Sequence, residues 1–506
     1  MTIFGNKHNI SSVNNTAEYQ YLATTGSNVL NIHYVGSLND DGSVNTSWNG
    51  FVSNSSGALF AADGGTINIY NSVFANNSAT SGSSGAMKAY NSSYLNIYDS
   101  VFKNNTSSDA VGAVGAQGST LIISGTLFED NTSVGNGGAV AAWSDSSITV
   151  VNSEFKNNTS TSGYGGALSI AGGTTTGVIK NSVFTGNTAG KGGAIYAKDS
   201  NITIDNTTFQ ENTDSNGGAA IWFESTTGST ANISNSKFIA NKGSAIYNQH
   251  GIMNISTSEF TDSDGARNAV WNNGTVNISD TLFKNNSVTN EIITNNSGAN
   301  AATITGSKFV NNTGWSIIYN TSTLTIYDST FSDNKGGGTS GTGAGAIYNT
   351  TGATTNIIAQ NQNVIFENNT ANGIANDILN NNGTINLNSA LGMKISLGGG
   401  IKASNSDETK NIININKTSS GTATDPVENS PTAGTIIFNN NVLNHTINLY
   451  SGTLKVGSGS YLNTNTLNLN GGTLNLANNA IDDIVLQDFS SCLLYTSPSP
   501  RDTERS

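Results

Sequence analysis

The 506-residue chain contains a single cysteine, Cys492, which lies close to its C-terminus. Without a second cysteine it cannot be a disulfide-stapled scaffold, and no disulfide could lock the chain before export through a narrow pore. It has only 4 Pro, and charged residues make up only 10% of it. A disordered chain of low hydrophobicity usually carries many charges and prolines, so this composition favours an ordered protein.

Basic residues are also scarce. The formal net charge is −13, and Arg267 is the only arginine before the last six residues. Nucleic acid and anionic lipid both bind to basic patches, so we expect no nucleic-acid partner. No run of about 18 apolar residues is present, and no basic segment leads into an apolar one at the N-terminus. This pattern predicts no membrane-spanning helix and favours a fragment that lacks its natural beginning.

The C-terminal tail has an unusual origin. The run from Cys492 to Asp502 is a direct translation of the adapter used in transposase-based DNA sequencing libraries. We therefore expect residues 492–506 to be adapter read-through and not native protein, and we exclude them from fold reasoning. The remaining chain has no cysteine.

Asn, Ser, Thr and 57 Gly make up much of the chain, and its apolar residues are mostly β-branched or aromatic, which is typical of β-structure with many turns. A nine-residue word ending in Phe recurs every 22 to 29 residues, with a last step of 35 to Phe366. Phe51 and Phe366 end looser copies. The eleven regular copies end at Phe74, Phe102, Phe128, Phe155, Phe184, Phe209, Phe238, Phe260, Phe283, Phe309 and Phe331.

Each position of the word has a physical interpretation. Apolar and polar residues alternate through its first places, which predicts a half-buried strand. Three places before Phe, ten of eleven copies carry Asn, Asp or Gly, which tolerate a left-handed backbone, and Thr257 is the exception. The next place is Ser or Thr in all eleven copies, where a hydroxyl can bond neighbouring backbone at a tight corner.

Asn follows three residues after Phe in every regular copy except that of Phe260, which has Ser263. These asparagines are Asn77, Asn105, Asn131, Asn158, Asn187, Asn212, Asn241, Asn286, Asn312 and Asn334, with Asn54 and Asn369 in the looser copies. After a variable loop the chain re-enters on a strand of small residues. Examples are 137–140, 165–168, 192–196, 217–222 and 345–348.

Two short strands, a left-handed bend and a third strand per repeat describe one coil of a β-helix. Successive coils would stack about 4.8 Å apart, giving an internal Phe stack and an Asn ladder along the axis. The sequence therefore predicts an all-β, right-handed parallel β-helix, a pectin-lyase-like solenoid. A β-sandwich is the alternative, but it needs no fixed word.

The alternation of Phe-x-x-Asn with Gly-Gly-Ala-Ile/Leu/Val resembles the repeats of chlamydial polymorphic membrane proteins and related autotransporter passengers, over about residues 50–370. This resemblance implies a bacterial cell-surface, outer-membrane or extracellular location. It also implies attachment to the membrane through a C-terminal β-barrel, which would be missing here.

The expected organisation has four parts. Residues 1–50 form an irregular segment or cap, and 51–375 form the Phe-x-x-Asn helix. Residues 376–491 form a stem of shorter coils with an extruded loop at 404–434, which contains Pro426 and Pro431. The adapter tail follows.

We expect no catalytic, cofactor-binding or metal-binding residue. Polysaccharide lyases and glycoside hydrolases also use this fold, and a hydrolase needs paired carboxylates. Most acidic residues lie instead at repeat turns, as do Asp99, Asp130, Asp280, Asp328 and Asp333. The least regular cluster is Asp262, Asp264 and Arg267. His8, His33, His250 and His445 show no metal-ligand spacing.

Aromatic residues after the small strand could form a stripe along one face, either packed inward as core, which we favour, or exposed to stack on sugars or a partner. They are Tyr196, Trp222, Tyr247, Trp271, Tyr319 and Tyr348.

The predicted function is that of a surface-exposed, non-catalytic passenger for adhesion or self-association. Its partner would be a host-cell receptor, a glycan or another copy of the chain. The alternatives are a polysaccharide lyase or glycoside hydrolase on the same scaffold, and a purely structural surface stalk.

Overall fold

The computed structural model describes residues 2–4, 10–11, 22–25, 27–33, 51–52, 59–79, 84–265, 267–337, 343–405, 407, 409–417, 433–464, 466–476, 485–487 and 493–495. Throughout this described part the chain is an all-β parallel β-solenoid without helices. It divides into two compact units, Met1–Asn254 (unit 1) and Ile255–Ser506 (unit 2), with the boundary inside β34 (Ile252–Ser256).

One coil of unit 1 shows the plan. The chain runs through β11 (Tyr94–Tyr98), β12 (Val101–Lys103), the two-residue β13 (Thr106–Ser107) and β14 (Val114–Gln117). Each strand pairs in parallel with its counterpart one coil on, so that Leu95 lies opposite Leu121. The stacked coils form three sheets: β11 belongs to the first, β12 to the second and β14 to the third. The two-residue strands such as β13, called rungs, form a separate row between the second and the third sheet.

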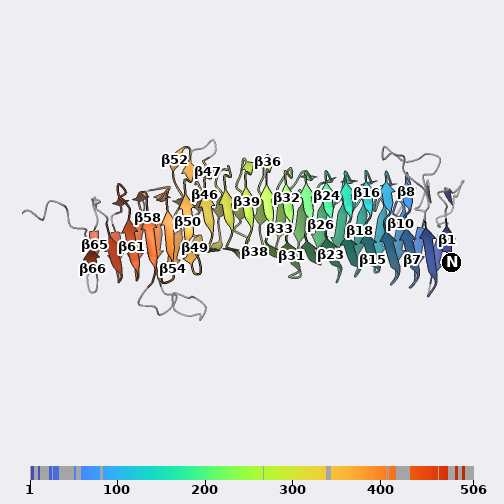
Figure 1. The fold of residues 1–506 in the computed structure, drawn as a ribbon, viewed down its shortest axis with the longest axis horizontal. Coiled ribbons are helices and arrows are strands. Elements are labelled where there is room, and N and C mark those ends of the chain that lie inside the picture. The colour runs from blue at the N-terminus through green and yellow to red at the C-terminus, as the bar shows by residue number, and fades with distance from the viewer. Residues whose placement is uncertain are drawn as a thin grey trace, which may run out of the picture. The chain divides into compact units, whose positions relative to one another are not determined.

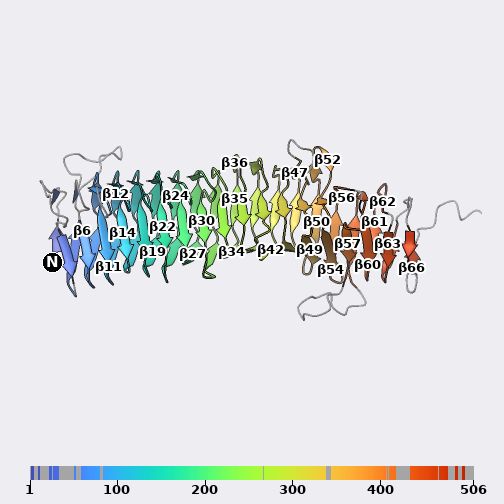
Figure 2. The same ribbon diagram turned by 180° about the vertical axis from the view of Figure 1, so that it is seen from behind.

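Figure 1 shows the first sheet through β15 and β23 and the second through β16 and β24, and Figure 2 follows the third sheet through β14, β22 and β30. In unit 1 the first sheet comprises β1 (Thr2–Phe4), β4 (Val29–His33), β7 (Thr66–Tyr70), β11, β15 (Thr120–Ser124), β19 (Ser147–Val151), β23 (Thr176–Lys180), β27 (Asn201–Asp205) and β31 (Thr230–Ser234). The second comprises β2 (Ile10–Ser11), β5 (Phe51–Val52), β8 (Val73–Ala75), β12, β16 (Leu127–Glu129), β20 (Glu154–Lys156), β24 (Val183–Thr185), β28 (Thr208–Gln210) and β32 (Lys237–Ile239). The third comprises β3 (Leu22–Thr25), β6 (Leu59–Ala62), β10 (Met87–Tyr90), β14, β18 (Val140–Trp143), β22 (Leu168–Ala171), β26 (Ile195–Lys198), β30 (Ile221–Glu224) and β33 (Ile246–Gln249). The rungs are β9 (Ser78–Ala79), β13, β17 (Thr132–Ser133), β21 (Thr159–Ser160), β25 (Thr188–Ala189) and β29 (Thr213–Asp214).

Unit 2 repeats the arrangement. Its first sheet comprises β38 (Thr275–Ser279), β42 (Ala301–Thr305), β45 (Thr323–Tyr327), β49 (Thr354–Ala359), β54 (Thr384–Ser389), β57 (Ile412–Ile415), β60 (Thr446–Leu449), β63 (Thr466–Leu469) and β65 (Val485–Gln487). The second comprises β35 (Glu259–Thr261), β39 (Leu282–Lys284), β43 (Lys308–Val310), β46 (Thr330–Ser332), β50 (Val364–Glu367), β55 (Lys394–Leu397), β58 (Thr435–Phe438), β61 (Thr453–Val456), β64 (Thr473–Asn475) and β66 (Leu493–Tyr495). The third comprises β37 (Val270–Asn272), β41 (Ile293–Asn295), β44 (Ile318–Asn320), β48 (Ile347–Asn349), β53 (Ile378–Asn380), β56 (Ile401–Ala403), β59 (Val442–Leu443) and β62 (Leu462–Asn463). Short strands are β36 (Asp264–Gly265), β40 (Ser287–Val288), β47 (Lys335–Gly336), β51 (Thr370–Ala371) and β52 (Ile374–Ala375).

The phenylalanines of the repeat form an internal stack in each unit. From Phe74 to Phe238 in unit 1 all are fully buried, with neighbouring ring centroids 4.7–5.1 Å apart. From Phe260 to Phe366 in unit 2 the distances are 4.6–4.8 Å. The rings are near-parallel because identical side chains repeat at the spacing of β-strands, about 4.8 Å.

The asparagines after Phe form an amide ladder beside this stack. Asn105 Nδ2 donates to Asn131 Oδ1 at 2.9 Å and to the carbonyl oxygen of Phe74 at 2.9 Å, and the same Asn131 Oδ1 accepts from Asn105 N at 3.0 Å. The pattern repeats from Asn77 to Asn241 in unit 1 and from Asn286 to Asn369 in unit 2. Each buried amide thus bonds across coils, which offsets the cost of removing it from water.

The left-handed bends occur where the word predicts them. All eleven residues three places before Phe have φ between 46° and 61°, and Thr257, the one β-branched residue among them, has φ 48°. The five acidic turn residues expected from the sequence, such as Asp130 and Asp333, also have positive φ. Asp130 and Asp333 belong to a second bend two places after Phe, which the sequence analysis did not recognise as a regular part of the word and which includes Ala240 at 49°.

One further feature departs from the expectations. Within the predicted loop 404–434, β57 pairs in parallel with β54 and β60, so the loop prediction is wrong for residues 412–415. Their alternating pattern, Ile-Ile-Asn-Ile, continues the first sheet. Residues 418–432, with both prolines, lie outside the described residues, as do most of 1–50 and Cys492.

Candidate functional site

The outward face of the third sheet in unit 1 carries the candidate site. Along β18, Val140 and Ala142 face the core, and so Ala141 and Trp143 face outward. The register defines two outward rows along the axis. The first row is Lys88, Gly115, Ala141, Ser169, Tyr196, Trp222 and Tyr247, and the second is Tyr90, Gln117, Trp143, Ala171, Lys198, Glu224 and Gln249.

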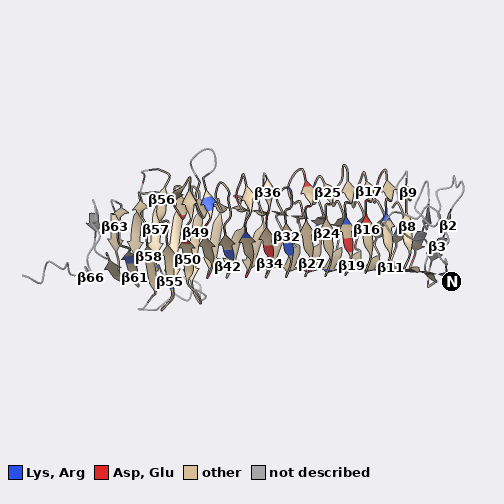
Figure 3. Cartoon of the chain, turned by 45° about the horizontal axis from the view of Figure 1, so that its top comes forward, with Lys and Arg blue, Asp and Glu red and all other residues tan. Residues whose placement is uncertain are grey.

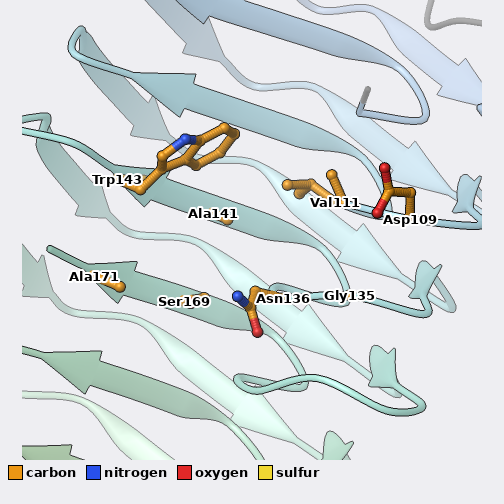
Figure 4. Close-up of a pocket in the computed structure, with 10 residues that line it drawn as sticks. Asp109, Val111, Gly135, Asn136, Ala141, Trp143, Ser169 and Ala171 are labelled. Carbon is orange, nitrogen blue, oxygen red and sulfur yellow. The ribbon is translucent and has the colours of Figure 1, made fainter. Parts of the chain in front are cut away.

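The surface is concave where the side chains of the first row are small. A hollow of about 400 Å³ has Ala141, Ser169 and Ala171 in its floor and Trp143 as one wall. Asp109 and Asn136, from the loops that precede β14 and β18, stand across the floor from the indole (Figure 4). This space is called the Trp143 hollow below.

Gly115 lets the indole lie close to the sheet. A Cβ at this position would contact Ser84 Oγ and lie 3.1 Å from Trp143 Cη2, so a larger residue would require these side chains to shift. Trp143 itself is half-buried, and Lys88 Nζ lies 5.4 Å from the centroid of its ring. Burial lowers the pKa of Lys88.

Larger side chains fill the same row in the following coils. Tyr196 and Trp222 are 3% and 4% exposed, and the Tyr164 ring packs 4.7 Å from that of Tyr196. Lys191 Nζ lies 5.2 Å from the Tyr164 ring and 4.4 Å from that of Trp222, at distances of cation–π contacts. These residues block the row next to Ser169.

The aromatic stripe is therefore covered in part. Tyr196, Trp222 and, in unit 2, Tyr348 are buried, while Tyr247, Trp271 and Tyr319 are half-buried. In unit 1 these side chains leave the solenoid on its outward face and are covered by loops and neighbouring rings. The inward direction that we favoured is wrong there, because the strand alternation gives the inward places to Ile195 and Ala197.

Two acidic side chains in strands, those of Glu129 and Glu224, are each paired with two lysines. Glu129 lies 2.6 Å from Lys103 Nζ and 3.1 Å from Lys156 Nζ, and Glu224 lies 3.1 Å from Lys198 Nζ and 3.7 Å from Lys191 Nζ. Burial alone would raise the pKa of Glu129, but its bonds to the two lysines hold it below the usual range. In Figure 3 most strand positions are uncharged, and basic and acidic positions lie next to one another near β16.

The irregular cluster in the Phe260 coil begins with a bend residue. Asp262 is exposed with φ 56°, the conformation of the corresponding residue in other coils. The side chain of Asp264 lies outside the described residues, and its backbone pairs with Ser287. Among the described residues, no three His, Cys, Asp or Glu side chains lie close enough together to hold a metal ion.

The histidines lie apart from one another. His33 stacks on Tyr70 with 4.6 Å between centroids, and His250 occupies a left-handed turn. His445 is buried in unit 2, with Nδ1 2.7 Å from the carbonyl oxygen of Leu443, and burial lowers its pKa to about 4. His8 lies outside the described residues.

The sequence analysis missed one buried carboxyl. Asp377, in unit 2, is fully buried at the end of the Asn ladder, where its oxygens accept from Asn369 Nδ2 at 2.9 Å and Gly399 N at 2.6 Å. Burial raises its pKa to about 7 in spite of these bonds. Its place in the chain, eight residues after the last ladder Asn, follows no pattern of the repeat.

No known protein family, curated protein or solved structure matches this chain. In the described part, no helix is long and apolar enough to cross a membrane.

Proposed function

We propose that the chain is a non-catalytic passenger of the autotransporter type, displayed on a bacterial surface, that acts in adhesion or self-association. The observation that carries the proposal is the Trp143 hollow, a concave surface with an apolar floor, a half-buried indole and a polar rim. Ligand sites in proteins are typically concave and apolar with a few placed polar groups.

The arrangement of charge supports binding over catalysis. A hydrolase of the usual kind needs two carboxyl groups facing one bond. Glu129 and Glu224 are instead each held between two lysines, and most of the other acids named above lie at bends. The polysaccharide lyase or hydrolase is thus the less favoured function, and a bare structural stalk leaves the Trp143 hollow without a role.

The test compares the purified chain on three substrates: host cells, a glycan panel, and pectin in a reducing-end assay. We expect saturable binding to cells or glycans and no new reducing ends. Release of reducing ends would establish the enzyme, and the absence of all binding would leave the stalk. Sequencing the locus past residue 491 tests the surface display, because a stop codon directly after this residue would contradict a C-terminal barrel.

A further inference from the structure

We propose that the Trp143 hollow binds an uncharged saccharide, one sugar ring lying against the indole while its hydroxyl groups bond to the rim. The inference rests on the proposed binding function and names its ligand. It follows from the shape of the hollow, the chemistry of its walls and the way the neighbouring coils close it.

The indole is a suitable platform for a sugar ring. Trp143 has both an apolar face and an N–H donor, and it is held in place by its neighbours. Gly115 leaves room beneath it, and Lys88 Nζ approaches its ring at 5.4 Å. A rigid aromatic surface loses little conformational entropy when a ligand binds, which favours affinity.

Polar groups occur at two levels of the same surface. At the rim, Asn136 is fixed because its Oδ1 accepts from Tyr164 N at 3.1 Å, and Asp109 offers a carboxylate. In the floor Ser169 is 2% exposed. Sugars present adjacent hydroxyl groups that both donate and accept, which matches a mixture of carboxylate, amide and hydroxyl.

The charge of the surroundings selects against acidic sugars. Asp109 lines the hollow, and the chain as a whole carries a net charge of −13. The cation beside Trp143, Lys88, approaches the ring of the indole and does not line the hollow. Anionic saccharides should therefore bind more weakly than neutral ones, most clearly at low salt.

Neighbouring coils confine the site. After Ser169 the first row continues with Tyr196 and Trp222, which occupy the space that the small residues leave open. In unit 1 the run of small residues in the first row is thus confined to Gly115, Ala141 and Ser169. We expect one saccharide per chain at this face.

The test uses the full chain on an array of neutral hexose and N-acetylhexosamine oligosaccharides, with uronic-acid oligosaccharides as the anionic arm. Calorimetric titration of the best-bound neutral oligosaccharide then compares variants. Trp143→Ala should weaken binding at least tenfold. Ser169→Tyr, which places in this coil the residue that the next coil has at Tyr196, should abolish binding without lowering the melting temperature.

Tyr94→Ala is the matched control, since Tyr94 is an aromatic residue, 49% exposed, on the first sheet. It should bind like the natural chain. The proposal would be overturned if the Trp143→Ala and Ser169→Tyr variants bound the oligosaccharide as tightly as the natural chain. A preference for uronic-acid oligosaccharides, or more than one binding site per chain, would also overturn it. If the chain adheres to cells through protein and no oligosaccharide binds, the saccharide inference fails while the adhesion function stands. If the chain binds the oligosaccharide but does not adhere to cells, the saccharide inference stands and the adhesion function fails.

Discussion

The two units differ at the turn that leads from the third sheet to the first sheet of the next coil. In unit 1 the inward residue before the corner is apolar in most coils, as in Ala116, Ala142 and Phe223, and Asn248 in the last coil is an exception. In unit 2 it is asparagine in five successive coils. These are Asn272, Asn295, Asn320, Asn349 and Asn380, whose side chains form a second buried ladder with Nδ2–Oδ1 distances of 2.8–3.1 Å.

The amide also closes the corner. Asn320 Oδ1 accepts from Ser322 N at 3.2 Å and its Nδ2 donates to Ser322 O at 3.1 Å, which turns the chain immediately after the strand. In unit 1 a serine hydroxyl serves the corner instead: Ser146 Oγ donates to the carbonyl oxygen of Trp143 at 2.7 Å.

This difference matters for function. The strands β10 to β33 in unit 1 have four residues, whereas β37 to β53 in unit 2 have three and end at the asparagine. The fourth residue forms the second outward row, to which Trp143 belongs. In these five coils of unit 2 the strand ends at the asparagine and the second outward row has no strand residue, whereas β33 of unit 1 keeps Gln249 after its asparagine, Asn248.

The largest effect should come from interrupting the second ladder. Asn320→Ala removes one of the two partners of Asn295 Nδ2, which keeps Thr323 O, and one of the two partners of Asn349 Oδ1, which keeps Thr355 Oγ1. It also removes the buried amide that closes the corner at Ser322. We expect the free energy of unfolding to fall by about 3 kcal/mol, measured by urea denaturation. Asn356→Ser, on the half-buried outer face of the same unit, is the control and should cost less than about 1 kcal/mol. Equal losses would show that the buried ladder has no special role.

The next prediction concerns the pH dependence of stability, to which two buried titratable groups of unit 2, Asp377 and His445, contribute in opposite directions. The pKa of Asp377 is raised from 3.8 to about 7, so the folded state holds its proton more tightly than the unfolded state. Its contribution to stability is present below pH 3.8 and is lost as the pH rises toward 7. The loss cannot exceed roughly 4 kcal/mol. We expect it to stay below the effect of Asn320→Ala, because relaxation around a buried charge lowers the cost of burying it.

His445 acts in the opposite direction over the same range. Its pKa is lowered from 6.5 to about 4, so its contribution is present above pH 6.5 and is lost as the pH falls toward 4, by at most about 3 kcal/mol. Unfolding free energies between pH 4 and pH 7 should be measured for Asp377→Asn and His445→Gln. The first variant should lose the alkaline-side decline, and the second the acid-side decline. Unchanged pH profiles in both would contradict the assignment.

A smaller effect is expected at the left-handed bends. Thr257 has φ 48° in unit 2, where the corresponding residue of unit 1, Asn235, has φ 51°. Exchanging the residues provides a symmetrical test: Thr257→Asn should stabilise the chain by about 1 kcal/mol, and Asn235→Thr should destabilise it by a similar amount. Melting temperatures should move in opposite directions, and parallel movement would argue against strain at Thr257.

The smallest effect concerns the surface ion pairs of unit 1. Glu129→Gln leaves the packing of the side chain between Lys103 and Lys156 in place and removes its charge. The loss should stay below about 1 kcal/mol and disappear in high salt. Denaturation at two ionic strengths measures it, and a loss that persists at high salt would indicate packing instead of charge.

The regular part of the fold follows from the sequence because its signals are local. The left-handed bends at Asn, Asp or Gly and the alternation before each Phe each reflect a preference of single residues. The same reasoning missed the strand at 412–415, because one alternating segment among polar residues carries no Phe to mark it. It also missed the short rungs, whose two residues are too few to show any period.

The candidate site could not be predicted from the sequence in the same way. Trp143 was not singled out, since one Trp at a strand end differs little from the aromatic residues of other coils. The signal was present in the register: Gly115, Ala141 and Ser169 are small where Tyr196 and Trp222 are large. It becomes visible only when coils separated by 26 to 29 residues are placed side by side.

The sequence by itself thus determined that the chain winds into coils, where the bend before each Phe lies, and that the repeated phenylalanines and the asparagines after them stack inside. These properties recur in nearly every Phe-bearing coil, so they can be recognised as a period in the sequence. Only the tertiary structure decided where the surface is hollow, where an aromatic residue is covered and where a carboxyl is buried. Those properties depend on neighbours from different coils, whose packing differs from one coil to the next even though the backbone repeats.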